Sequence, residues 1–203
     1  MNFCQHCAGP ITRQIPPGDD KLRDCCLRCD VVFYQNPHHL VGTLPVYGDR
    51  VLLCKRAIDP RRGKWTLPAG FMENGETTLQ GAIRETAEEA GAHVSPDGCR
   101  LYTLFNLPNI NQVYLFFLAD LQHPRFSPGE ESLEVALFEE KDIPWNEIAF
   151  AVVKMTLEQY FKDRGRRLFP VRMFDLHYDD ARRLSTTLVS HSHGDISGEN
   201  HHS

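Results

Sequence analysis

Several features that mark whole classes of protein are missing from the sequence. No run of eighteen apolar residues occurs in its 203 residues, and residues 1–4 do not lead from a basic into an apolar stretch. A membrane-spanning helix and a secretory leader need such segments. There is no block of Lys and Arg with interleaved aromatics, and the formal net charge is -5. We therefore expect a cytoplasmic protein whose partners include neither a membrane nor a nucleic acid.

The sequence also lacks the cysteines of a secreted disulfide framework. Its seven cysteines are too few for a chain of this length, and an odd number cannot all pair. Four of them form two pairs, Cys4-x-x-Cys7 and Cys26-x-x-Cys29, separated by eighteen residues. Zn²⁺ prefers four ligands at the corners of a tetrahedron, and two such turns supply four sulfurs with no open position. The pattern predicts a small zinc ribbon over residues 1–37, in which Zn²⁺ has a structural role.

The other three cysteines have different interpretations. Cys25 is an alternative ligand to Cys26, and Cys26 is preferred because its spacing to Cys29 repeats the first pair. Cys54 and Cys99 lie in apolar, strand-like sequence, which is typical of small core residues.

Apolar periodicity predicts a mixture of strands and helices after residue 38. Expected strands are 40–47 and 51–54, joined by a Gly48-Asp49 turn, then 100–105, 112–119 and 133–138; expected helices are 78–90 and about 145–163. This indicates the α/β (α+β) class, with a mixed sheet packed between helices over residues 38–165. Residues 166–203 form a C-terminal extension, and its last dozen polar residues are expected to be disordered.

The segment from Gly70 to Ala92 is the most informative one. At about 100° per residue, Glu85, Glu88 and Glu89 gather on one helix face and leave the opposite face for packing. Carboxylates three and four residues apart repel one another, so a multivalent cation such as Mg²⁺ or Mn²⁺ would stabilise them. A solvated acidic surface is the alternative for a Glu-x-x-Glu-Glu pattern taken alone.

The spacing of the whole segment resembles the Nudix box: Gly, five residues, Glu, seven residues, then Arg-Glu-x-x-Glu-Glu-x-Gly. The matching positions are Gly70, Glu76, Arg84, Glu85, Glu88, Glu89 and Gly91. Thr86 and Ala92 stand where the family usually has a larger aliphatic residue. Since those are packing positions, the departure leaves the chemistry untouched.

The resemblance implies an α/β/α sandwich and hydrolysis of a P–O bond in a nucleoside diphosphate derivative. It assigns Glu85, Glu88 and Glu89 as ligands of Mg²⁺ or Mn²⁺, and it gives Arg84 the role of orienting a carboxylate. The main-chain carbonyl of Ala69 often joins the coordination shell in similar enzymes. The metals would neutralise diphosphate charge and lower the pKa of an attacking water.

Glu134 is a candidate for a further acid of the site. It stands at the start of an expected strand, where similar enzymes bring another glutamate towards the metals, and it is either a metal ligand or the general base. The alternative is a surface glutamate in the acidic run 130–134.

The substrate is expected to be a small dinucleotide. A zinc ribbon before a Nudix domain is typical of NADH diphosphatases, but their Ser-Gln-Pro-Trp-Pro-Phe signature is absent from residues 104–112. The sequence is more similar to FAD diphosphatases, which form FMN and AMP. This similarity covers residues 34–37, 51–56, 65–70, 128–134 and 143–150.

A different substrate, a non-catalytic function and a homodimer are further possibilities. Pro108, sixteen residues past the box, is reminiscent of ADP-ribose diphosphatases. A non-catalytic nucleotide sensor is the alternative from another class, and the intact box argues against it. Similar enzymes are frequently homodimers, although no apolar stripe in this sequence proves one.

Overall fold

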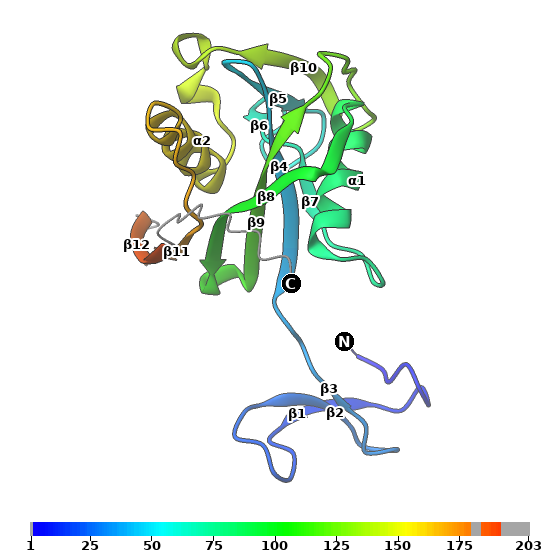
Figure 1. Cartoon of the computed structure of the whole chain (residues 1–203). Coiled ribbons are helices and arrows are strands. Elements are labelled where there is room, and N and C mark those ends of the chain that lie inside the picture. Colours follow the sequence, from blue (N-terminus) through cyan, green and yellow to red (C-terminus); the bar gives the residue numbers. More distant parts are fainter. Residues whose placement is uncertain (1, 180–183, 192–203) are drawn as a thin grey trace, which may run out of the picture. The chain divides into compact units, whose positions relative to one another are not determined.

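The computed structural model describes residues 2–179 and 184–191. The chain divides into two compact units, Met1–Pro37 and His38–Ser203. The first unit holds an antiparallel sheet formed by β1 (Ile11–Gln14), β2 (Arg23–Cys26) and β3 (Val32–Phe33) (Figure 1). The last dozen residues, for which the sequence predicts disorder, lie outside the described residues.

The second unit is built on one mixed sheet. Over the described residues its strand order is β10-β5-β4-β9-β8-β11-β12, with β6 paired to β5 and β7 to β4. The strands are β4 (His38–Tyr47), β5 (Arg50–Arg56), β6 (Trp65–Thr66), β7 (Ala69–Phe71), β8 (Val94–Leu107), β9 (Gln112–Leu121), β10 (Ser132–Phe138), β11 (Arg172–Tyr178) and β12 (Leu184–His191). β4 runs parallel to β9 and β11 parallel to β8, whereas β8 and β9 are antiparallel.

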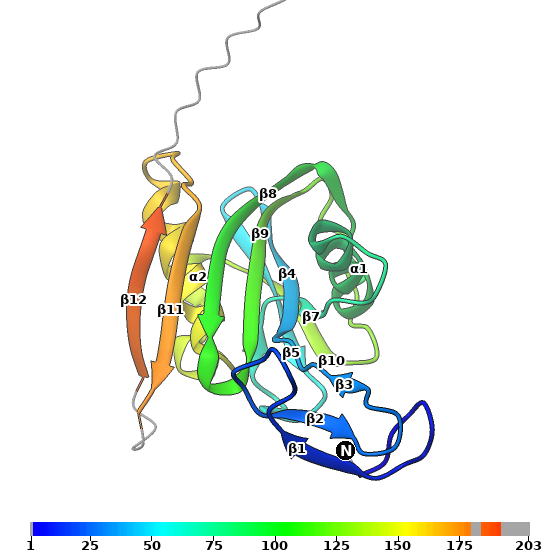
Figure 2. The ribbon, with the colours of Figure 1, turned by 90° about the horizontal axis from the view of Figure 1, so that it is seen from below.

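Helices α1 (Thr78–Ala90) and α2 (Ala151–Arg164) cover opposite faces of this sheet (Figures 1 and 2). The mixed sheet between helices confirms the predicted fold class. The 3₁₀ turns are η1 (Pro108–Ile110), η2 (Glu140–Asp142) and η3 (Trp145–Glu147). In the part of the chain that the structure describes, no helix is both long and apolar enough to cross a membrane.

The two-sided cover explains the continuous apolar runs of the central strands. In β5, Leu52 and Cys54 pack with Ala90 of α1, while Val51 and Leu53 pack in the core that contains α2. Successive side chains of a strand point to opposite faces, so a strand buried on both faces needs apolar residues at every position.

Local signals set the limits of α1. Thr77 and Gln80 form a capping box at its start, in which each side chain accepts a hydrogen bond from the other's backbone N–H. Gly91 ends the helix in the left-handed region, at φ 56°. The predicted limits, 78 and 90, are those observed.

The predicted start of the second helix was wrong. Residues 145–147 form η3, and α2 begins only at Ala151. Between them the chain is extended, because Ile148 bridges Trp65 and the N–H of Ala149 donates to the carbonyl of Trp65 at 2.8 Å. These contacts with β6 compete with the helix and delay its start.

The sequence analysis did not identify the strands after residue 165. In the structure, β11 and β12 extend the sheet beyond β8 (Figure 2). A buried polar contact joins β11 to α2 and β8. Arg172 makes two hydrogen bonds to the carboxylate of Asp163, at 2.5 and 2.8 Å, and the Tyr102 hydroxyl donates to the same carboxylate at 2.7 Å. Because Asp163 is only 4% exposed, this pairing is what makes its burial tolerable.

Candidate active site and zinc site

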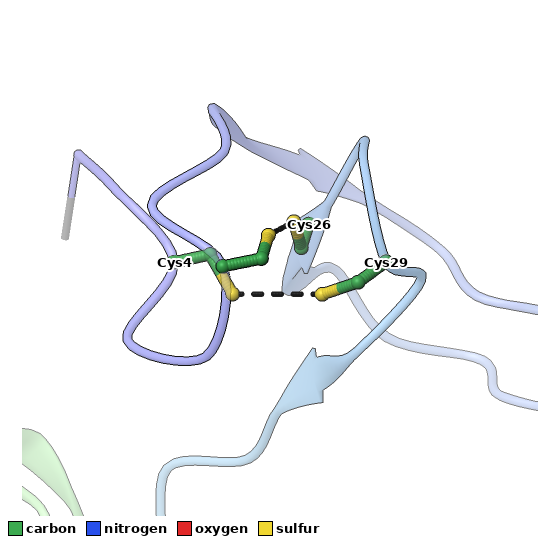
Figure 3. A group of neighbouring side chains, drawn as sticks. Cys4, Cys26 and Cys29 are labelled. Carbon is green, nitrogen blue, oxygen red and sulfur yellow. Dashed lines mark hydrogen bonds between the residues drawn. The ribbon is translucent and has the colours of Figure 1, made fainter.

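The first unit brings four cysteines together at one point. The Sγ atoms of Cys4 and Cys29 are 3.7 Å apart and those of Cys7 and Cys26 are 3.5 Å apart, and all four lie within 4.8 Å of one another (Figure 3). A tetrahedral zinc site with Zn–S bonds of about 2.3 Å has S–S edges of about 3.8 Å. The four sulfurs therefore fit Zn²⁺ in both chemistry and spacing.

Backbone N–H groups prepare three of these sulfurs for a metal. The N–H of His6 points at Cys4 Sγ, that of Gly9 at Cys7 Sγ and that of Arg28 at Cys26 Sγ, each at 3.3 to 3.4 Å. Such donors favour the thiolate, which is the form that binds metal.

Cys25 lies outside the group of four. Its sulfur faces the carbonyls of Arg23 and Gln14, at 3.7 and 4.0 Å.

We therefore predict that Cys26→Ser lowers the bound zinc per chain from one to well below one-half, and that Cys25→Ser retains it. A colorimetric zinc assay on dialysed protein measures both. Retention of zinc by Cys26→Ser with loss by Cys25→Ser would reverse the assignment.

In the second unit, Arg84 organises the acidic face of α1. Its Nε and Nη2 donate to the carboxylate of Glu76 at 3.1 and 2.8 Å, and Nη1 donates to Glu85 at 2.7 Å and Glu88 at 3.0 Å. Nη2 also reaches the carbonyl of Phe71 at 3.2 Å. The Arg84 guanidinium holds the pKa of Glu76 down at about 2, so this pair is charged throughout the physiological range.

Glu89 is buried, although it lies on the helix face opposite to the one for which the sequence predicts packing. It is 7% exposed, and its Oε2 accepts a hydrogen bond from the Ala69 N–H at 3.2 Å. Burial raises the pKa of Glu89 to about 8; the Ala69 N–H and Arg56 oppose the rise, and the charges of Glu85 and Glu131 add to it. Glu88, in contrast, has a side chain that is 60% exposed.

The three glutamates offer the hard oxygen donors that a divalent cation prefers, although among the described residues only the four cysteines have their ligand atoms gathered within 4.8 Å of one another. Within the described part of the chain, one oxygen of each carboxylate has a protein partner, Arg84 for Glu85 and Glu88 and the Ala69 N–H for Glu89. The second oxygen of each is left as a hard ligand. Burial raises the pKa of Glu85, Arg84 opposes the rise, and the charges of Glu88 and Glu131 add to it, so a nearby cation would offset this crowding of negative charge.

Gly70 of β7 allows the close approach that this arrangement needs. A Cβ atom at this position would collide with the carboxylate of Glu85. The glycine therefore lets the strand that carries Ala69 lie directly against the acidic face of α1, which places the backbone of Ala69 beside Glu89.

The structure does not bring Glu134 into this group. Its carboxylate pairs with Lys55 at 3.4 Å, its side chain is 54% exposed, and it does not line the cavity described below. A register shift between Ser132 and Glu134 sets this pairing with β5.

The loop before β10 supplies Glu130 and Glu131 to the cavity instead, and the sequence analysis did not single them out. Three backbone hydrogen bonds fix this loop: Ser127 N–H to Ala90 O at 2.8 Å, Gly129 N–H to Glu89 O at 3.1 Å, and Ala57 N–H to Glu131 O at 2.7 Å. A Cβ at Gly129 would collide with the main-chain oxygen of Glu88. The loop is thus held directly against the end of α1.

A cavity of about 1270 Å³ opens beside these acids. Glu85, Glu88 and Glu89 line one part of it, and Arg56 and Arg61 line another. Its aromatic lining consists of Phe71, Tyr114, Phe116, Phe150 and Tyr178. Acids that can hold a cation, arginines that can bind phosphate, and rings that can stack on a base all meet in one space.

Comparison with known proteins identifies the family of both units. A family model described as NUDIX domain matches residues 37–156, and a second, described as Nudix N-terminal and representing the Nudix zinc ribbon, matches residues 2–35. The solved structure of a Nudix hydrolase from Nitrosomonas europaea is 50% identical, with a TM-score of 0.80, and the match covers 86% of this chain and 99% of that one.

Two curated relatives match more than half of the chain at lower identity. An ADP-ribose pyrophosphatase from Methanocaldococcus jannaschii is 27% identical over 55% of this chain and 67% of its own length. A NAD-capped RNA hydrolase, NudC, from Photobacterium profundum is 28% identical over 68% of this chain, and the match spans 49% of that relative. The chain thus spans about half the length of NudC.

The fold and the acidic helix define a protein of the class that acts on pyrophosphate bonds. The chain belongs to the Nudix family, with an N-terminal Nudix zinc ribbon.

Proposed function

We propose that the protein hydrolyses the diphosphate bond of a nucleotide derivative with an ADP half, with Mg²⁺ or Mn²⁺ held by Glu85, Glu88 and Glu89. The observation that carries the proposal is the three-carboxylate face of α1 opening into a cavity with arginines and aromatic rings. A bound divalent cation would neutralise diphosphate charge and lower the pKa of water. The carbonyl of Ala69 is proposed as an additional ligand.

Arg56 is placed to bind the diphosphate. Its Nε donates to the carbonyl of Pro60 at 2.9 Å, and its guanidinium lies 5.2 Å from the centroid of the Phe150 ring. These contacts hold a positive charge at the cavity, and that charge is close enough to lower the pKa of Glu89. An arginine fixed in this way can pair with phosphate oxygens without losing further side-chain freedom.

We also propose Glu131 as the general base, which is one of the two roles that the sequence analysis considered for Glu134. Glu131 lines the cavity, and its charge acts on both Glu85 and Glu89. A positioned base contributes on the order of 100-fold or more to the rate. Glu131→Gln should therefore lower kcat about 100-fold, and Glu134→Gln, which removes only an exposed ion pair, should change kcat less than about twofold.

Steady-state kinetics of both variants against the wild type test this assignment. The opposite ranking, with Glu134→Gln slow and Glu131→Gln near wild type, would return the role of base or ligand to Glu134.

FAD is the first candidate substrate, on the strength of the resemblance along residues 34–37, 51–56, 65–70, 128–134 and 143–150. The relative from Methanocaldococcus jannaschii supports ADP-ribose as the second. The NudC relatives add NAD-capped RNA. NADH is included because a zinc ribbon before a Nudix domain resembles the NADH diphosphatases. All of these contain an ADP half joined through a diphosphate.

A substrate panel tests the proposal. The purified protein is incubated with Mg²⁺, or separately Mn²⁺, and FAD, ADP-ribose, NADH or NAD-capped RNA, and products are separated by chromatography. We expect AMP from FAD, with FMN, at the highest kcat/KM. A higher kcat/KM for another substrate keeps the reaction and replaces FAD. No cleavage of any with either metal would favour a nucleotide sensor.

A further inference from the structure

Part of the active-site cavity comes from outside the segment that matches the family model. That segment ends at residue 156, whereas β11 begins at Arg172. β11 pairs in parallel with β8 from Arg172↔Thr103 to Asp175↔Asn106, and its last residue, Tyr178, lines the cavity together with the acids of α1. The C-terminal hairpin therefore adds a wall to the site.

Two side chains fix the end of β11 in this position. Asn109 of η1 donates from Nδ2 to the carbonyl of Tyr178 at 3.3 Å, and its Oδ1 accepts the Tyr178 N–H at 3.2 Å. Three residues earlier on each segment, Asn106 donates to Asp175 at 2.8 Å. The turn that joins β8 to β9 thus holds both the N–H and the carbonyl of Tyr178.

The Tyr178 ring differs from the other aromatic rings of the cavity. Tyr114 stacks on Phe116 with ring centroids 6.3 Å apart, Phe71 meets His38 edge-on at 5.6 Å, and Phe150 has the Arg56 guanidinium 5.2 Å from its ring centroid. Across residues 2–179 and 184–191, the Tyr178 ring stacks on no other aromatic ring, and the residue is 37% exposed. A ring on a fixed backbone with a free face is suited to stack on a planar ligand.

We propose that Tyr178 is a specificity-determining residue that stacks on an aromatic ring of the substrate, either adenine or the ring system of the second half. This rests on the proposed function, because the ligand is the nucleotide derivative cleaved at the same site. The ring binds substrate at a distance from the reacting phosphorus, so it acts on ground state and transition state alike and changes KM more than kcat.

The test measures kcat and KM for wild type, Tyr178→Phe and Tyr178→Ala with FAD, NADH and ADP-ribose. Stacking of a base on an aromatic side chain corresponds to about tenfold or more in affinity. Tyr178→Ala should raise KM about tenfold, with kcat nearly unchanged, and Tyr178→Phe should restore the wild-type KM. Tyr34→Ala, which removes an exposed ring from the first unit, is the matched control.

Comparing the three substrates shows which of the two possible rings Tyr178 stacks on. If Tyr178 stacks on adenine, KM rises for all three; if it stacks on the second ring, KM rises for FAD and NADH and not for ADP-ribose, which lacks that ring. A KM within twofold of wild type for every substrate overturns the proposal, as does a Tyr178→Phe variant as impaired as Tyr178→Ala.

Calorimetric titration with AMP and FMN keeps this test independent of turnover. If the wild type cleaves none of the substrates, the proposed function fails, and the role of Tyr178 is then decided by binding. A loss of about tenfold or more in affinity for either nucleotide in Tyr178→Ala supports it. Equal affinities in both proteins, or no binding to the wild type, overturn it.

Discussion

Glu89→Gln is expected to lower kcat on the order of 1000-fold while the fold stays intact. The substitution removes the charge of the most buried carboxylate of the site, and the cation chemistry that it supports corresponds to several kcal/mol of transition-state stabilisation. The amide oxygen of glutamine can still accept the Ala69 N–H, which Glu89 accepts at 3.2 Å. Kinetics at saturating substrate with Mg²⁺ and with Mn²⁺ measure the effect.

Glu158→Gln is the matched control, since this glutamate lies on α2, in the half-buried part of its surface and outside the cavity lining. Its kcat should stay within twofold of wild type. If Glu89→Gln turned over substrate as fast as the wild type, Glu89 would have no role in catalysis. The assignment of the acidic face of α1 as the metal site would then be wrong.

The same variant has a second expected effect on stability without Mg²⁺ or Mn²⁺. The pKa of Glu89 is raised from 4.5 to about 8 in the folded state, because burial disfavours its charge. Between these values the unfolded chain binds fewer protons than the folded one, so the free energy of unfolding falls as pH rises from about 4.5 to 8. With zinc bound and no Mg²⁺ or Mn²⁺ added, the wild-type Tm should fall over this window, and Glu89→Gln should have the higher Tm at pH 8. A lower Tm than wild type at pH 8 would contradict the burial argument.

Arg172→Ala is expected to reduce the free energy of unfolding by about 3 to 5 kcal/mol. Arg172 binds both oxygens of Asp163, and both side chains are largely shielded from solvent, at 14% and 6% exposure. Without the guanidinium, a buried carboxylate keeps only the Tyr102 hydroxyl as a charge-stabilising donor from this cluster. Urea denaturation measures the change.

Arg166→Ala provides the comparison, because Arg166 is exposed at the end of α2 and should change the free energy of unfolding by less than about 0.5 kcal/mol. The double variant Asp163→Ala/Arg172→Ala should be destabilised less than the sum of the two single variants, since it leaves no unpaired charge. Equal, small effects of Arg172→Ala and Arg166→Ala would show that β11 does not depend on this ion pair.

The elements that the sequence predicted are those whose signals are local. The strands beneath both helices have continuous apolar runs because both faces are covered, and α1 is limited by a capping box at Thr77 and by Gly91. The sequence analysis missed β11, although the alternation of Phe174, Leu176 and Tyr178 with polar residues is a local signal of a half-buried strand. Its stability comes from pairing with β8 and from Asp163, neither of which the local sequence reveals.

In the candidate site, too, the contacts within one segment could be predicted from the sequence and those between distant segments could not. Glu76, Arg84 and Glu85 lie within one helical segment and its preceding loop, so their spacing predicts their contacts. Arg56 and Glu131 come from distant segments, and no sequence spacing tells which loop folds over the end of α1. Glu134 stays a prediction as the further acid: it pairs with Lys55 beyond the register shift at Ser132, and Glu131 of the same acidic run lines the cavity.

Hydrolysis in water enriched in ¹⁸O tests the central claim most directly. The protein is incubated with Mg²⁺ and the best substrate of the panel, and the mass of each product is measured. Attack of water on phosphorus predicts AMP and the second monophosphate in equal amounts, with one ¹⁸O atom in the phosphate of one of them. Products without ¹⁸O in either phosphate, or cleavage at a bond outside the diphosphate, would contradict the account.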